Sequence, residues 1–275
     1  MSLALIVAGI IGFVVNHGFN LGIDFLGGSL LEIEFQRDID VSELRQVMSE
    51  LGFRNAILQR TDSNRFIIRT TPITPETKDR ILDTLDEKLG IKRPPLQDRN
   101  VLPGFGKDIT RYALIAIGIS VVGILIYVWI RFELRFGVSA IVALIHDVLI
   151  TLGVYAILHR EVNTSTVAAV LTILGYSLND TIVVFDRIRE NTSLASKLGY
   201  AKIVNNSVNQ TLARSINTSL TTLFPIVVLL AIGSPALKDF ALTLTVGIVS
   251  GTYSSIFIAS PLLVIWNNRF PKYKK

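Results

Sequence analysis

Residues 174–191 read LGYSLNDTIVVFDRIREN, and they begin inside an apolar run, residues 165–185, that is long enough to cross a bilayer as a helix. Asn179 and Asp180 therefore lie within a predicted membrane span. Asp180 precedes the basic segment at Arg187 by about 10 Å of helix. An ionised carboxylate at such a depth costs a few kcal/mol. The stretch predicts a membrane protein with an ionisable side chain in its interior.

Five further apolar runs accompany this span in a chain of 275 residues that is 50% hydrophobic, with a mean hydropathy of +0.50. Long apolar runs of this kind are typical of integral membrane proteins. One run contains Pro225, which a membrane helix tolerates when neighbouring groups satisfy the freed carbonyl. The six predicted membrane helices cover residues 3–15, 112–130, 136–158, 165–185, 216–232 and 237–266.

The first run, residues 3–15, is short for a span and lacks a basic flank. A cleaved signal peptide would need a cationic start and a small-residue cleavage site, and the sequence has neither. We therefore expect residues 1–17 to form a first membrane helix whose first turn is missing.

Lysine and arginine in the short loops fall mainly on one side of the predicted spans, which identifies that side as cytoplasmic. Both termini are then cytoplasmic and residues 18–107 extracytoplasmic, while residues 108–275 form helices two to six with a cytoplasmic loop, residues 186–214. The net charge of +5 reflects this clustering, so we expect no nucleic-acid binding. The opposite side carries only Arg160 and Lys238. The cytoplasmic cluster comprises Arg131, Arg135, Arg187, Arg189, Lys197, Lys202, Arg214, Arg269, Lys272, Lys274 and Lys275.

Residues 18–107 have the pattern of one small α+β domain. Residues 29–35 alternate in polarity like a strand, and Thr74 with Pro75 begins a helix that Gly90 ends. The order β-α-β-β-α-β predicts a ferredoxin-like domain, a fold that hosts many functions. The predicted strands cover residues 29–35, 56–61, 65–70 and 97–102, and the predicted helices cover residues 41–51 and 75–89.

Asp180 is the first candidate for chemistry, because burial disfavours its charged form whereas a nearby cation favours it. A carboxyl group balanced between these effects loads and releases a proton near neutral pH. Arg214 begins the fifth span, and antiparallel helices would bring it to the same leaflet as Asp180. The alternatives are a polar residue that holds helices together for Asp180, and an ordinary positive-inside flank for Arg214.

His146 and Asp147 are adjacent inside the third span, where they form either a proton relay or a structural pair. Asn179 is a further candidate for relay or support beside Asp180. The chain has no cysteine, and its His and carboxylate residues do not recur at ligand spacing. We therefore predict no metal site, no cofactor and no acyl-transfer triad.

A glycine-rich motif, GIDFLGG, contains Gly22, Asp24, Gly27 and Gly28. Glycines permit sharp turns and close approach of another chain, so the motif is a candidate interface. No helix clearly follows it, which argues against a phosphate-binding loop.

Four segments of the sequence resemble the SecF proteins, the smaller half of the SecDF protein-export factor in the resistance-nodulation-division superfamily. The resemblance covers nearly the whole chain, and the third segment is very specific. Leu26 departs from the family, which usually has Thr there, and the cationic leader of the family is absent. The segments are, in order, GIDFLGGSLLEIEF, ALIHDVLIT, GYSLNDTIVVFDRIREN and LARSINTSLTT.

The resemblance implies a six-helix bundle, half of a transporter, in the cytoplasmic membrane of a bacterium or archaeon. It implies SecD, separate or fused, and the SecYEG translocon as partners, with YajC and YidC as further candidates. The implied function is to use the proton-motive force to draw unfolded preproteins from the channel. In that family the residues matching Asp180 and Arg214 take part in proton transport, together with an Asp of the SecD half.

Two other functions compete with export. A proton-coupled exporter half for small molecules belongs to the same superfamily, but such exporters usually carry much larger outer domains. An intramembrane aspartyl protease would use Asp147 and Asp180, but the Tyr-Asp and Gly-x-Gly-Asp sequences of those enzymes are absent. We therefore expect a transport subunit rather than an enzyme.

Overall fold

The computed structural model describes residues 2–101, 103–194 and 198–271, and the chain divides into two compact units. Met1–Asn20 and Leu114–Lys275 make up the helical unit, and Leu21–Ala113 make up the α+β unit. The second boundary falls within helix α5 (Pro103–Arg131), a few residues beyond the predicted boundary after residue 107.

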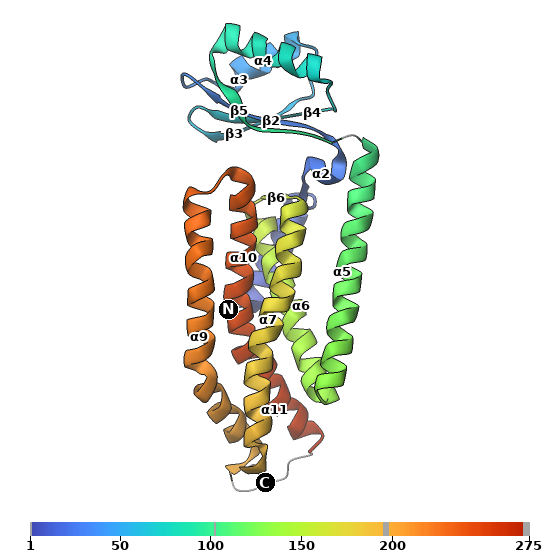
Figure 1. The fold of residues 1–275 in the computed structure, drawn as a ribbon, viewed down its shortest axis with the longest axis vertical. Coiled ribbons are helices and arrows are strands. Elements are labelled where there is room, and N and C mark those ends of the chain that lie inside the picture. Colours follow the sequence, from blue (N-terminus) through green and yellow to red (C-terminus); the bar gives the residue numbers. More distant parts are fainter. Residues whose placement is uncertain (1, 102, 195–197, 272–275) are drawn as a thin grey trace. The chain divides into compact units, whose positions relative to one another are not determined.

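The helical unit consists of apolar helices, most of which pack against one another, whereas α5 has few contacts with the rest (Figure 1). Among the described residues, five helices are long and apolar enough to cross a membrane, and the last of these runs over Leu237–Arg269. The first helix is apolar too, but with 14 residues it is shorter than the other five. The elements are α1 (Ser2–Val15), β1 (Asn20–Leu21, at the unit boundary), α5, α6 (Leu134–Ile157), β6 (Glu161–Val162), α7 (Thr164–Asn191), η1 (Thr192–Leu194), α9 (Tyr200–Ile232), α10 (Pro235–Ser254), η2 (Ser255–Ala259) and α11 (Ser260–Arg269).

Helix α1 packs closely against α6 because two glycines meet at the crossing. A Cβ atom added to Gly9 would lie 2.5 Å from the Cα atom of Gly153. Just beyond the helix, the side-chain amide of Asn16 donates to the carbonyl oxygen of Ala156 at 2.9 Å. Helix association in lipid depends on such close backbone approach. The short helix is therefore an integral part of the bundle.

The segment predicted as a cytoplasmic loop, residues 186–214, is largely helical. Helix α7 continues to Asn191, and α9 begins at Tyr200. The side-chain amide of Asn191 donates to Ser207 Oγ at 2.9 Å, which ties the two extensions together. The loop prediction was wrong here because it counted only apolar residues as helix. The helices continue into the polar residues on either side of the connection. Lys197, Lys272, Lys274 and Lys275 lie outside the described residues.

The last span is not a uniform α-helix. Helix α10 ends at Ser254, and the five residues of η2 form a π-helical turn before α11 continues. Pro261 lies in the first turn of α11 and has no N–H to donate, which favours an irregular ladder at this point. Ser260 Oγ donates to the carbonyl oxygen of Ser255 at 2.8 Å. Such π turns inside helices often occur at functional sites.

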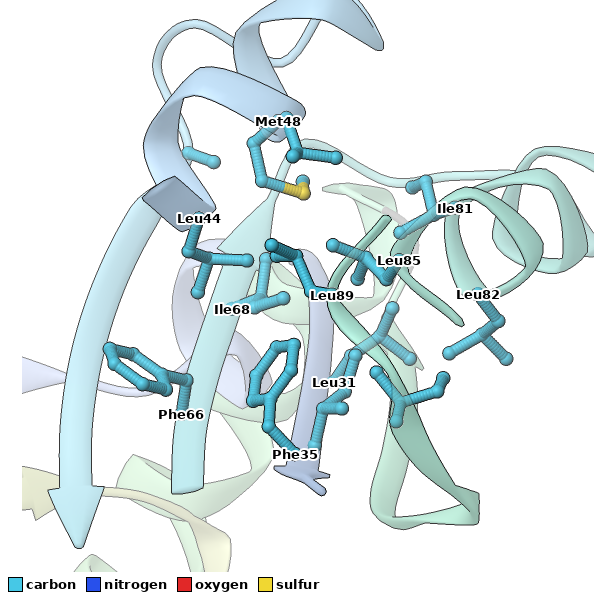
Figure 2. Close-up of a cluster of buried hydrophobic side chains, with 14 of the residues drawn as sticks. Leu31, Phe35, Leu44, Met48, Phe66, Ile68, Ile81, Leu82, Leu85 and Leu89 are labelled. Carbon is cyan, nitrogen blue, oxygen red and sulfur yellow. The ribbon is translucent and has the colours of Figure 1, made fainter. Parts of the chain in front are cut away.

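The α+β unit has the order β2-α3-β3-β4-α4-β5, and its antiparallel sheet has the strand order β3-β4-β2-β5. Side chains of both helices join those of the sheet in one apolar core. Figure 2 shows Leu44 and Met48 of α3 and Leu85 of α4 gathered over Phe66 and Ile68 of β4. The elements are α2 (Ile23–Leu26), β2 (Gly28–Phe35), α3 (Val41–Glu50), β3 (Ile57–Asp62), β4 (Arg65–Thr70), α4 (Pro75–Leu89) and β5 (Ile91–Val101).

Most predicted elements of this unit agree with the structure to within a residue, but β5 is longer than predicted. Helix α4 has Thr74 as its N-cap and ends at Gly90, which has a φ of +70°. Strand β5 begins at Ile91 rather than at residue 97. Its first part contains Pro94 and Pro95, opposite a shift in the β2–β5 register. A strand accommodates prolines at such an irregularity, because ladder hydrogen bonds are already interrupted there.

Candidate functional site

Asp180 lies on the buried face of α7, and its side chain contacts the π turn. The residue is 7% exposed, and its Oδ2 accepts a hydrogen bond from Ser255 Oγ at 2.7 Å. Within the described part of the chain, Asp180 has no ion-pair partner. A buried carboxylate that is held by one neutral hydroxyl has little compensation for its charge.

Asp147 on α6 is fully buried inside a cage of donors. Ser177 of α7 and Ser254 of α10 donate to Oδ2 at 2.6 and 2.7 Å. Ser250 of α10 donates to Oδ1 at 2.6 Å, and His146 Nδ1 lies 3.0 Å from the same oxygen. The cage satisfies both carboxylate oxygens and joins three helices at one point. Asp147 thus has the hydrogen bonding that Asp180 lacks.

His146 is oriented by its neighbours on both sides. Its ring stacks on Tyr253 of α10, with centroids 6.1 Å apart and planes inclined by 26°. Among the described residues, the buried Nε2 atom has no hydrogen-bond partner. With Nδ1 donating to Asp147, a neutral imidazole leaves Nε2 as an unprotonated acceptor. The ring therefore supports the cage around Asp147 and does not reach Asp180 through any hydrogen bond in the described residues.

Asn179 and Arg214 lie on the exposed surface of the helical unit. In the portion of the chain that the structure describes, neither side chain forms a hydrogen bond or ion pair with Asp180. The antiparallel register of α7 and α9 brings Asp180 level with residue 218, so Arg214 is displaced by four residues, or about 6 Å along the helix axis. Arg214 therefore lies at a similar depth, and it is exposed. The register follows from hydrogen bonds between Arg187 and Gln210 and between Tyr176 and Thr222.

The two buried carboxylates are separate and do not share a proton. Each is bonded to its own hydroxyl groups, and the described residues contain no hydrogen bond between Asp147 and Asp180. An aspartyl protease needs two carboxyl groups in direct hydrogen-bond contact. The geometry therefore argues against the protease alternative.

Sequence reasoning missed the four serines that hold these carboxylates. Ser250 and Ser254 are spaced by four residues, so they lie on one helix face, and Ser255 follows directly. That spacing in an apolar helix was the available signal. Serines are common in membrane helices, however, and only the packing shows which of them face a carboxylate.

The glycine motif has a structural role within the α+β unit. Asp24 of α2 is 2% exposed and forms an ion pair with Arg99 of β5. Gly28 has a φ of +133°, and a Cβ atom there would lie 2.7 Å from the carbonyl oxygen of Thr70. Gly27, with a φ of +74°, precedes it. Only glycine fits this turn comfortably, so the motif fixes how the chain enters strand β2. The described residues contain no group of three His or carboxylate side chains that could hold a metal ion.

These features define the class of the protein: a multi-pass membrane protein with ionisable groups inside its helical bundle. The sequence matches two described families, "Protein export membrane protein SecD/SecF, C-terminal" over residues 83–269 and "SecD/SecF GG Motif" over residues 12–39. The chain belongs to the SecD/SecF family of protein-export membrane proteins.

Individual relatives agree with this assignment. The protein translocase subunit SecF of Desulfurispirillum indicum is 40% identical over 99% of this chain and 90% of that protein. The protein translocase subunit SecDF of Thermus thermophilus is 42% identical over 98% of this chain, which spans only 37% of that longer protein. A crystal structure of SecDF from that genus, described as a translocon-associated membrane protein, has a TM-score of 0.87 at 41% identity, again over 98% of this chain and 37% of that one. A second structure, SecDF in its super-membrane-facing form, has a TM-score of 0.69 at 40% identity, over 98% of this chain and 38% of that one.

Proposed function

We propose that this chain is a SecF-type subunit that uses the proton-motive force to promote protein export through the Sec translocon. The observation that carries the proposal is the environment of Asp180, a buried carboxyl whose only hydrogen bond among the described residues comes from a neutral hydroxyl. We assign proton uptake to this carboxyl because it is buried and has no ion-pair partner among the described residues. Asp147 is already satisfied by its cage and is better suited to a structural role.

The exposed face of α9 is evidence for a second membrane-embedded protein in contact with it. We propose that this partner is SecD, either separate or fused. Four exposed polar residues, Arg214, Asn217, Thr218 and Thr221, follow one another at helical spacing on this face. Polar groups inside a membrane face a protein partner or an aqueous cavity, since lipid offers no hydrogen bonds. A carboxylate supplied by that partner would pair with Arg214. Asn179 lies exposed on the neighbouring helix and belongs to the same proposed interface.

In the proposed cycle, a proton enters from the outer side and neutralises Asp180. The long-range attraction of Asp180 for Arg214, with which it forms no ion pair in the described residues, and for the partner's groups then weakens, and the helices shift. Moving one charge across the membrane potential supplies about 2.3 kcal/mol per 100 mV, which is enough to bias a two-state movement by a useful factor. The shift would move the segment 18–107, which holds or releases the emerging unfolded polypeptide.

The finer architecture belongs to the same proposal. The α+β unit would be a ferredoxin-like domain, in agreement with its element order and its antiparallel sheet. Helix α1 would also span the membrane, which brings the number of membrane helices to six. Both termini would be cytoplasmic, and residues 18–107 would be extracytoplasmic. SecYEG would be the translocon partner, with YajC and YidC as further candidate contacts.

An export assay in cells tests the role of Asp180. We expect Asp180→Asn to accumulate unprocessed precursors, because the amide cannot take up a proton. Asp79→Asn makes the same chemical change on the exposed surface of α4 and should export normally. Normal export by Asp180→Asn, at normal protein levels, would contradict the proposal.

A further inference from the structure

The serine pair at the start of the π turn connects the two buried carboxylates. Ser254 donates to Asp147 on α6, and the next residue, Ser255, donates to Asp180 on α7. Two consecutive residues of the last span therefore bind the two acidic side chains. The arrangement places the irregular turn η2 directly against the carboxyl group to which we assign proton uptake.

The Ser255 hydroxyl has two acceptors but only one hydrogen. Its Oγ lies 2.7 Å from Asp180 Oδ2 and 2.9 Å from the carbonyl oxygen of Thr252 on its own helix. When Asp180 is ionised, the hydroxyl donates to the carboxylate, because a charged acceptor gives the stronger bond. When Asp180 is protonated, its own O–H donates to Ser255 Oγ, and the serine hydrogen turns to the Thr252 carbonyl. No proton leaves Ser255 in this exchange.

The preceding turn of α10 is held independently of this exchange. Ser250 and Ser254 bind Asp147, and Ser177 of α7 binds the same carboxylate from the other side. The cage anchors α10 to α6 and α7 on the N-terminal side of η2. A change at Ser255 therefore acts at a boundary between a fixed segment and an irregular one.

The same turn also reaches the helix that carries Arg214. The side-chain oxygens of Thr252 on α10 and Ser219 on α9 lie 2.6 Å apart. Ser219 follows Arg214 by five residues on α9. Asp180 thus has no direct contact with Arg214 among the described residues but is linked to its helix through Ser255 and Thr252.

We propose that Ser255 is a positioning residue that transmits the protonation state of Asp180 to the π turn and, through Thr252, to helix α9, with the Asp147 cage as the fixed anchor. The proposal deepens the proton-driven function and rests on it. Replacing a charge-assisted hydrogen bond by a neutral one roughly halves its strength. The link between α7 and η2 at Ser255 therefore weakens on protonation, while the links at Asp147 stay unchanged.

In any titration, the signals of other ionisable groups near this site must be distinguished from that of Asp180. Apart from charged groups near the helix ends, the described residues of α7 and of the elements packed against it carry Tyr176 on α7, His146, Asp147 and Tyr155 on α6, Arg214 on α9 and Tyr253 on α10. Only Asp147 among these has a carboxyl group, so Asp147→Asn separates its signal from that of Asp180.

Infrared difference spectroscopy on the full chain in lipid vesicles, between low and high pH, tests the proposal. The C=O band of protonated Asp180 is identified by its loss in Asp180→Asn. We expect Ser255→Ala to shift this band to the higher frequency of a carboxylic acid without an acceptor. Ser255→Thr retains the hydroxyl and should restore the original band. Ser250→Ala removes a donor to Asp147 and should leave the Asp180 band unchanged.

Two outcomes overturn different claims. An Asp180 band that is identical in Ser255→Ala and in the unsubstituted chain would contradict the role of Ser255 but leave the proton site intact. The absence of any titrating Asp180 band would contradict the proposed function and this inference together.

In export assays with the partner subunits, we expect Ser255→Ala to lose most of the gradient-dependent increment, several-fold, and to keep the gradient-independent rate. Equal loss of both rates would indicate a merely structural role and would also overturn the inference.

Discussion

At the scale of single residues, the two buried aspartates differ in how their charges are compensated. Asp147 receives three serine hydroxyls and lies beside an imidazole nitrogen, whereas Asp180 receives one hydroxyl. The cage fixes the Asp147 side chain from three helices, whereas a single hydroxyl holds Asp180 among the described residues. We therefore propose different roles for the two residues, based on the serines around each side chain.

The Asp147 cage should contribute measurably to stability. In Asp147→Asn the amide nitrogen cannot accept hydrogen bonds, so at least one buried donor loses its acceptor, at a cost of about 1–3 kcal/mol each. We expect a lower midpoint of unfolding in mixed detergent micelles. Asp186→Asn is the matched control, because this half-exposed residue pairs with Arg131 and Arg189 and its loss should cost at most about 1 kcal/mol. Equal effects of the two substitutions would contradict the cage.

The sequence predicted the burial of Asp180 and Asp147, since both lie inside long apolar runs. It did not predict that Arg214 is exposed and forms no ion pair with Asp180 in the described residues, because packing against neighbouring helices sets the rotation of a membrane helix about its axis. It also did not identify the serine donors. A serine that faces a carboxylate and one that bonds its own helix have the same local sequence pattern.

At the scale of elements, glycines determine how closely α10 can approach α7. A Cβ atom added to Gly251 would lie 2.9 Å from the Cβ atom of Ser177, one of the donors to Asp147. Another added to Gly247 would lie 2.1 Å from Ile173 Cδ1. These two positions are four residues apart and form one contact face. The polar cage and the close helix packing are therefore parts of the same interface.

Gly251→Ala should weaken this interface. The added methyl group must displace the backbone or Ser177, with a strain of about 1–3 kcal/mol, and it should also lengthen the hydrogen bond from Ser177 to Asp147. We expect a lower unfolding midpoint in micelles. Gly175→Ala, on α7, is the control, because a Cβ atom there meets nothing within 4 Å and the change should be neutral or stabilising by up to about 1 kcal/mol. Greater loss in the control would contradict this packing.

Element boundaries were predicted best where a local signal exists. Thr74 and Gly90 bound helix α4 as expected, since an N-cap hydroxyl and a positive φ are read directly from residue type. The helical extensions within 186–214 and the π turn were missed. The extensions depend on side-chain contacts such as the bond from Asn191 to Ser207, which have no local signal. Pro261 was a local signal for an irregular hydrogen-bond ladder, but a proline in a span does not by itself specify a π turn.

At the scale of the whole molecule, the helical unit leaves a polar face uncovered. The exposed stripe on α9, containing Arg214 and Thr221, lies within a helix that is long and apolar enough to cross a membrane. The chain also spans only 37% of the Thermus thermophilus SecDF that it matches. Both observations support the proposal that the stripe contacts another membrane half.

Site-directed cross-linking tests that contact. The chain has no cysteine, so Thr221→Cys gives a single attachment point for a photoreactive maleimide. We expect it to cross-link to the partner half in membranes. Val122→Cys on exposed α5 is the control and should label without forming that product. Equal cross-linking from both positions, or none from Thr221→Cys, would contradict the proposed interface.

The central claim is that Asp180 couples proton movement to export, and its most direct test is the gradient dependence of translocation in vesicles that contain the chain, its partner half and the translocon. The quantity to measure is the ratio of translocated precursor with and without an imposed proton gradient. The account predicts a ratio above one for the unsubstituted chain and a ratio of one for Asp180→Asn, with equal translocation by both when no gradient is imposed. Undiminished stimulation by the gradient in Asp180→Asn would contradict it.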